Sequence, residues 1–176
     1  MKKKMTVISL VALVAVLVAG VVFGSGIAAA DTDSARSGWV MGRGTVSTPE
    51  SKLVRGYGFR LNARVNENGS ATGSFAARIQ LRHQADAVAD QAHRIVRIQA
   101  RFNEGSLAEN HAKLAGTARA YLANGEVLTD LPFKLGTRLG ERGEYGMVLH
   151  VGDRVIEGKG VAGDVIISLA RDRASD

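Results

Sequence analysis

The sequence of 176 residues contains no cysteine, which excludes disulfide bonds, thiolate zinc sites and cysteine nucleophiles. It contains only two prolines, which excludes a proline-rich linker protein. Hydrophobic residues make up 45% of the chain, enough to form a core. The length corresponds to roughly one domain, and without disulfide bonds that domain must be stabilised by packing alone.

Aromatic residues are also scarce, at 5% of the chain, with Trp39 as the single tryptophan. A carbohydrate cleft usually has aromatic walls, and a nucleic-acid surface usually places aromatic rings among its basic side chains. We therefore expect neither a glycosidase nor a nucleic-acid-binding protein. The formal net charge is +6, but three lysines lie at positions 2–4. Without them 20 basic and 17 acidic side chains remain, which makes the rest of the chain only mildly basic.

The first thirty residues have the three parts of a secretory signal peptide. Lysines 2–4 are followed by an apolar stretch over 7–23, and Ala28 and Ala30 place small side chains before Asp31. We expect cleavage after residue 30, with an uncleaved membrane anchor over 5–27 as the alternative. Both interpretations predict that residues 31–176 are extracytoplasmic, either secreted or membrane-anchored.

Most of the remaining chain alternates between apolar and polar residues with the period of a β-strand. The alternating segments are 57–65, 71–81, 96–102, 114–122, 127–135, 147–151 and 161–169. Residues 84–92 instead have apolar residues at helical spacing, which predicts a long loop or a short helix. The segments 103–110 and 136–146 are rich in Gly, Glu and Asn and are expected to be loops.

Two turns can be tested against the faces of their strands, because paired residues of a hairpin lie on the same face. The first turn, 67–69, fits a three-residue loop that ends in a left-handed glycine and pairs Val65 with Ala71. At the second turn the apolar residues of the first strand have even numbers and those of the second have odd numbers. An even-length loop is then required, which favours a two-residue Asn124-Gly125 loop that pairs Leu122 with Val127.

These patterns predict an all-β fold, a single antiparallel barrel or sandwich of about 7–9 strands, preceded by the signal or anchor helix. The expected organisation is a signal peptide over 1–30, a flexible leader over 31–37 and the β-domain over 38–176.

Short glycine and apolar motifs recur along the chain in a familiar order. They are Gly-Arg-Gly-Thr at 42–45, Tyr-Gly-Phe at 57–59, Asn-Gly at 68–69, Gly-Ser-Phe at 73–75, Ala-Lys-Leu-Ala-Gly at 112–116, Pro-Phe at 132–133 and Gly-Glu-Arg-Gly at 140–143. Over about 57–169 the chain resembles the small secreted bacterial β-rich domains of the post-COAP-1 type. In the family's loop a proline usually precedes the last glycine, whereas Arg142 stands here. The resemblance implies no catalytic residues.

The residue patterns that usually carry chemistry are mostly missing. The four histidines have no metal-ligand spacing, and no Gly-x-Ser-x-Gly nucleophile motif occurs. Glu141 and Glu144 share a glycine-rich loop, but their spacing matches no standard calcium site. We therefore expect no catalytic residues, no metal and no cofactor, and hence a protein that is not an enzyme.

Arginines form the one pattern that points to binding. Alternation places six of them on the polar faces of three strands: Arg60, Arg64, Arg78, Arg82, Arg97 and Arg101. If these strands are neighbours, their guanidinium groups line one sheet face and attract an anionic envelope polymer or a lipid surface. The competing interpretation is an ordinary solvated face, with the arginine stems covering the sheet.

The leading hypothesis is therefore a secreted, non-enzymatic binding or structural module of the cell envelope that uses a basic sheet face. The alternative is a β-barrel that carries a small apolar ligand, because six inward positions hold small residues: Ala63, Gly73, Ala77, Ala100, Gly116 and Ala118. In that alternative the interior must be hollow, whereas four phenylalanines on the same faces could fill it instead. An extracytoplasmic enzyme is the third hypothesis, and it requires polar groups that converge in a cleft.

Overall fold

The computed structural model describes residues 36–82, 93–140, 144–161 and 164–170. These residues form nine strands and no helix, so the described part has no helix long and apolar enough to span a membrane. The strands are β1 (Gly38–Ser47), β2 (Val54–Val65), β3 (Ala71–Leu81), β4 (Ile95–Leu107), β5 (His111–Leu122), β6 (Val127–Leu139), β7 (Glu144–Val151), β8 (Arg154–Val161) and β9 (Val165–Leu169).

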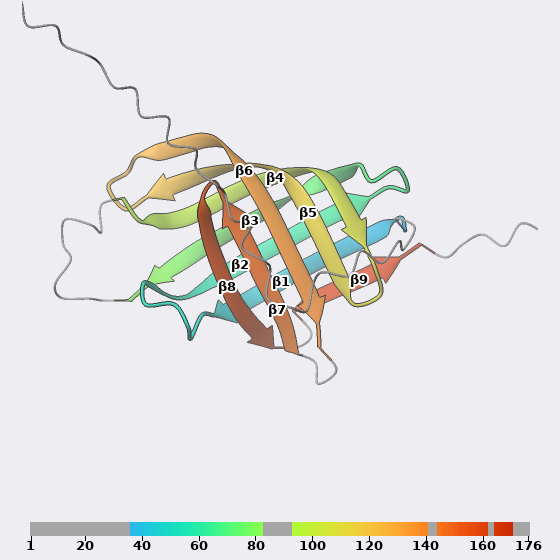
Figure 1. Ribbon diagram of the computed structural model, residues 1–176, viewed down its shortest axis with the longest axis horizontal. Coiled ribbons are helices and arrows are strands. Elements are labelled where there is room, and N and C mark those ends of the chain that lie inside the picture. The colour runs from blue at the N-terminus through green and yellow to red at the C-terminus, as the bar shows by residue number, and fades with distance from the viewer. Residues whose placement is uncertain (1–35, 83–92, 141–143, 162–163, 171–176) are drawn as a thin grey trace, which may run out of the picture. The chain divides into compact units, whose positions relative to one another are not determined.

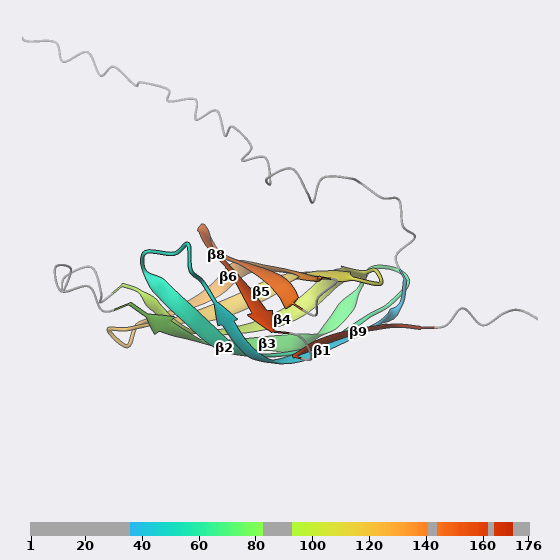
Figure 2. The ribbon, with the colours of Figure 1, turned by 90° about the horizontal axis from the view of Figure 1, so that it is seen from below.

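The first eight strands form a closed antiparallel barrel, which decides between the two predicted architectures. Each of these strands pairs with the next along the chain, and β8 pairs with β1 to close the sheet. β9 is an additional strand that pairs with β1 next to β8 (Figure 1). Figure 2 shows β1, β2, β3 and β9 along one wall of the barrel, opposite β5, β6 and β8.

The first predicted hairpin is confirmed. Val65 pairs with Ala71 and Leu61 with Phe75. In the turn, the amide of Asn66 donates to the carbonyl of Ser70, and Gly69 has a φ of 77°. The Asn68 side chain accepts a hydrogen bond from the Ser70 amide at 3.0 Å, which further fixes the turn.

The second hairpin differs from the prediction. Val127 pairs with Tyr121, not with Leu122, and the Leu122 amide bonds to the carbonyl of Glu126 across a three-residue turn. The apolar residues do change from even to odd numbers between the two strands, but the cause is a β-bulge farther along β6 and not the length of the turn. There Asp130 has a φ of 56°, and the extra residue returns the apolar side chains of β6 to the inner face.

Several segment boundaries also differ from the predictions. Residues 103–107 and 136–139 are strand rather than loop, because β4 and β6 are each 13 residues long. The predicted strand over 161–169 is confirmed over residues 165–169, which form β9, whereas residue 161 belongs to β8. The predicted signal peptide, the helix or loop over 84–92 and most of the leader lie outside the described residues, as does the signal or anchor helix.

Aromatic rings occupy the centre of the barrel. Phe59 stacks on Phe75 with ring centroids 6.2 Å apart, Phe75 on Phe133 at 5.5 Å, and Phe102 lies 6.0 Å from Phe133. Each of these rings is buried. Burying one such side chain contributes roughly 1.5–3 kcal/mol. These rings are therefore a central part of the core of a domain that has no disulfide bond.

The barrel closes at a narrow seam between β8 and β1. Among the described residues the register there has two residue pairs, Val46 with Gly160 and Ser47 with Lys159. The ring of Tyr145 on β7 lies directly over Gly160, where a Cβ atom would come 2.0 Å from the ring carbon Cζ. Its hydroxyl reaches across to β1 and donates to the Thr45 carbonyl oxygen at 3.4 Å. One aromatic side chain thus connects three strands at the closure.

Candidate anion-binding face

The candidate site is the outer surface of strands β1 to β4, which we call the arginine face. It is defined by the outward arginines Arg43, Arg60, Arg64, Arg78, Arg97 and Arg101, all of which are exposed. β2 pairs with β1 and with β3, and β3 pairs with β4, so the strands are neighbours as the hypothesis requires. Five of the six predicted arginines belong to this face. The sixth, Arg82, lies just beyond the end of β3, and its Nε donates to the Ser51 carbonyl at 3.0 Å.

Two pairs of arginines lie directly opposite each other on adjacent strands. Arg43 pairs in register with Arg60, and Arg78 pairs with Arg97. Residues directly opposite each other in a sheet have Cβ atoms roughly 4.5–5.5 Å apart, and like charges at that separation are destabilising. The fold therefore retains two unfavourable contacts on the same surface.

Within the described residues, none of these arginines forms an ion pair with a carboxylate. β1, β2 and β3 contain no aspartate or glutamate, and β4 contains one, the exposed Glu104. An ion pair joins Arg36 to Glu109 at 4.0 Å, and neither residue belongs to the arginine face. The guanidinium of Arg97 stacks 5.2 Å above the ring of Tyr121, which orients it without neutralising it.

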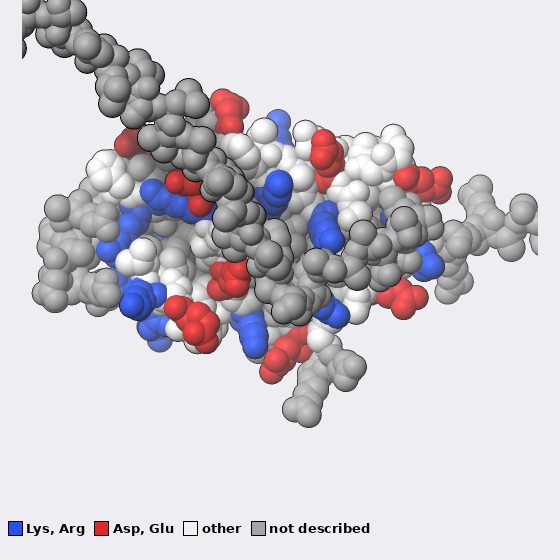
Figure 3. All heavy atoms as spheres, viewed as in Figure 1, with Lys and Arg blue, Asp and Glu red and all other residues white. Residues whose placement is uncertain are grey.

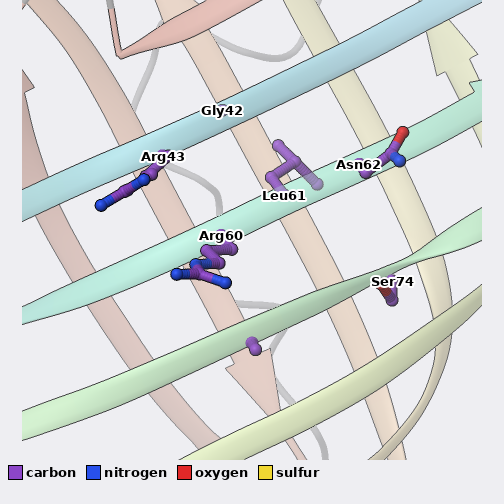
Figure 4. A pocket seen from close by; sticks show the side chains of 7 residues that line it. Gly42, Arg43, Arg60, Leu61, Asn62 and Ser74 are labelled. Carbon is purple, nitrogen blue, oxygen red and sulfur yellow. The ribbon is translucent and has the colours of Figure 1, made fainter.

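A shallow hollow of about 500 Å³ lies beside the first arginine pair. Arg43 and Arg60 line it together with Asn62 and Ser74, as Figure 4 shows. Ala76 is in register with Arg60, and its short side chain leaves space next to the two guanidinium groups. The hollow therefore combines two positive charges with an amide and a hydroxyl, the donor groups that bind phosphate or carboxylate oxygens.

The opposite wall has a different charge distribution. Figure 3 shows acidic and basic side chains interspersed over β6, β7 and β8. These strands contain the acidic residues Asp130, Glu144 and Glu157 and the basic residues Lys134, Arg138, Arg154 and Lys159. Charges of one sign are therefore segregated on β1 to β3, while the surface of β6 to β8 is mixed.

Two tyrosines, Tyr57 and Tyr145, are buried in the barrel interior. Burial, and next the proximity of Tyr145, raises the pKa of Tyr57 far above its usual range. Burial, and next the carboxylate of Asp164, raises the pKa of Tyr145 to about 12. Both phenols remain protonated at neutral pH, so neither is suited to proton transfer there. In the described part of the chain, no three His, Asp or Glu side chains gather as metal ligands would.

Replacing Tyr57 by phenylalanine is expected to stabilise the barrel. Among the described residues, the Tyr57 hydroxyl is buried without a hydrogen-bond partner, so its removal relieves a desolvation cost of about 1 kcal/mol. Burial raises the pKa of Tyr57 far above its usual 10.0, so above pH 10 the Tyr57 phenol ionises more readily in the unfolded chain than in the barrel, and the barrel loses stability as the pH rises. Tyr57→Phe should therefore increase the free energy of unfolding at pH 7 and move the alkaline unfolding midpoint upward. Urea denaturation followed by circular dichroism across this pH range measures both, and an unchanged alkaline midpoint would contradict the assignment.

Arg43 is the functional candidate that the sequence interpretation missed. Its neighbours Gly42 and Gly44 occupy the inward positions of β1, so the segment lacks the apolar alternation that identified the other strands. The available signal was the alternation of outward residues, in which Trp39, Met41 and Arg43 recur at every second position.

The comparisons with known proteins add no relative. No protein-family model, curated protein or solved structure matches the chain. The resemblance to the post-COAP-1 domains therefore stays a prediction, and the interpretation of the arginine face rests on its own geometry.

Proposed function

We propose that this barrel is a non-enzymatic binding module that attaches to an anionic surface outside the cytoplasmic membrane through its arginine face. The observation that carries the proposal is the register of Arg43 with Arg60 and of Arg78 with Arg97. Two like-charge contacts without an ion-paired carboxylate among the described residues cost folding energy, and an anionic partner converts that cost into binding energy. The extracytoplasmic location is supported by the signal-peptide pattern of residues 1–30.

The hollow beside Arg43 supports a specific form of this contact. Planar guanidinium groups bind two oxygens of one phosphate or carboxylate at once, which lysine cannot do. Asn62 and Ser74 supply further donors at the same place. The arginine face is thus suited to oxygen-rich anions rather than to diffuse negative charge alone.

The alternative function, carriage of an apolar ligand, requires the same barrel, and the barrel itself is confirmed. The interior favours the outer face as the site, because the aromatic rings are stacked through the centre. The glycines predicted to face inward do not open space either. Gly73 is exposed in the structure, and a Cβ atom at Gly116 would collide with the Arg101 carbonyl oxygen.

The proposal predicts salt-sensitive retention on an immobilised anion. At low ionic strength the protein should be retained by inorganic polyphosphate coupled to a resin and pass through an uncharged resin of the same matrix. Retention should weaken steadily as the salt concentration approaches about 1 M, where the screening length falls to roughly 3 Å. Equal retention on both resins, or retention that ignores salt, would contradict an electrostatic site.

A further inference from the structure

Three exposed apolar side chains lie at one border of the arginine face. Trp39 is 40% exposed, Met41 43% and Ile166 52%. Met41 on β1 pairs directly with Ile166 on β9, and Trp39 is two residues before Met41 on the same face. The three side chains therefore form one patch, which we call the apolar border.

Basic and polar groups adjoin this border on the side of β2. Arg64 pairs with Trp39, and Asn62 pairs with Met41. Arg43 follows Met41 by two positions and points to the same side of β1. The apolar border and the hollow beside Arg43 and Arg60 are consequently continuous parts of one surface.

A dissolved polyanion offers charges but gives no reason to expose Trp39, Met41 and Ile166. A phospholipid bilayer offers both components at the right depths, phosphates at its surface and hydrocarbon a few ångströms below. Tryptophan prefers that boundary, and apolar side chains inserted beside basic residues are typical of proteins that lie on anionic membranes. The charge of the surrounding arginines favours negatively charged lipids.

We propose that the partner of the arginine face is a bilayer containing anionic phospholipids. Trp39, Met41 and Ile166 insert between the headgroups while Arg43, Arg60 and Arg64 bind lipid phosphates. This inference rests on the proposed function and narrows its partner to one class. It assigns a role to the exposed tryptophan, which the electrostatic proposal alone leaves without one.

The single tryptophan of the chain makes insertion directly measurable. Mixing the protein with vesicles of phosphatidylcholine and phosphatidylglycerol should shift the emission of Trp39 to shorter wavelength. Vesicles whose acyl chains are brominated should quench it, and pure phosphatidylcholine vesicles should do neither. Binding to the anionic vesicles without any quenching would overturn the insertion.

A double variant tests the apolar border while keeping the reporter. Met41→Ser with Ile166→Ser should weaken binding to the anionic vesicles about tenfold or more, because the buried apolar area is lost. Val127→Ser with Val155→Ser is the matched control, since these side chains are 43% and 52% exposed on β6 and β8. Equal losses in the two double variants would contradict a specific role for the apolar border.

Retention on polyphosphate separates this inference from the proposed function. The Met41/Ile166 variant should keep its retention on polyphosphate, because its arginines are intact. A protein that binds polyphosphate but not the vesicles would retain the proposed function and lose the lipid partner. A protein that binds neither would contradict both. If Trp39 emission shifts with protein concentration in the absence of vesicles, a second copy of the chain covers the border instead, and the lipid assignment is wrong.

Discussion

Replacing Arg43, Arg60, Arg78 and Arg97 together by glutamine is expected to abolish most binding to anionic vesicles at low salt. A basic residue near a negatively charged membrane contributes about 1 kcal/mol, so four replacements should weaken binding by about 4 kcal/mol, or roughly 1000-fold. Vesicle sedimentation at several salt concentrations measures the loss. The salt dependence of the remaining binding should also become shallow, because fewer charges are involved.

A control with the same change in net charge shows whether position matters. Lysines 52, 113, 134 and 159 are exposed and lie outside the arginine face. Their joint replacement by glutamine removes four positive charges as well. This variant should retain most of the binding. Comparable losses in the two variants would mean that net charge alone drives attachment, which would contradict a defined face.

The stability of the arginine variant distinguishes binding from packing. If the arginine stems mainly cover the sheet, their truncation should lower the melting temperature and leave binding unaffected. If the arginines are retained for binding, removing two directly opposed like-charge pairs should leave the melting temperature unchanged or raise it slightly. Lost binding with undiminished stability is the signature that the proposed function requires.

Period-two alternation predicted much of the fold, and its failures have identifiable causes. The first hairpin is correct in register because its turn residues and its apolar faces agree. The second is wrong by one position because a bulge at Asp130 changes parity inside β6, a change equally compatible with a shorter turn. Alternation reports which side chains share a face and leaves open where the extra residue is placed.

Closure of the barrel was not predictable from alternation for a related reason. The two strands at the seam, β1 and β8, have glycines at inward positions where other strands have apolar side chains. The apolar–polar alternation that identifies a strand is therefore missing from their sequences. The glycines are there because neighbouring side chains occupy their space. Val46 lies against Gly158, and the Asp164 carboxylate lies against Gly44. Such contacts form only in three dimensions, which is why sandwich and barrel stayed equivalent in the sequence.

The sequence predicted only part of the candidate site, because alternation does not show which strands become neighbours. The arginines of β2, β3 and β4 follow clear alternation, and the structure places five of the six predicted residues on one face. Arg43 and the apolar border belong to β1 and β9. The inward glycines of β1 interrupt its alternation, and the pairing of β1 with β9 was not visible in the sequence. The strand register shows which arginines lie directly opposite each other and which side chains lie beside them, and neither could be predicted from the sequence.

Substituting Gly160 by alanine is expected to give the largest loss of stability at the seam. The added Cβ atom would approach ring atom Cζ of Tyr145 to 2.0 Å and its hydroxyl oxygen to 2.1 Å. The ring must move, and its contact with the Thr45 carbonyl across the closure is then lost. Overpacking of this kind costs about 1–3 kcal/mol, and the short β8–β1 pairing leaves few other contacts to compensate. Urea denaturation should therefore show a loss near the upper end of that range.

Gly146→Ala is the matched control, because Gly146 lies on the adjacent strand β7 and a Cβ atom there meets nothing within 4 Å. This variant should be neutral or slightly more stable, since alanine reduces the entropy of the unfolded chain. Combining Gly160→Ala with Tyr145→Leu should cost less than the sum of the two single changes, because the smaller side chain makes room for the new methyl group. Additive losses would show that Gly160 is needed for a backbone conformation rather than for the tyrosine ring. The closure of the barrel would then depend on the path of β8 itself and not on the aromatic contact across it.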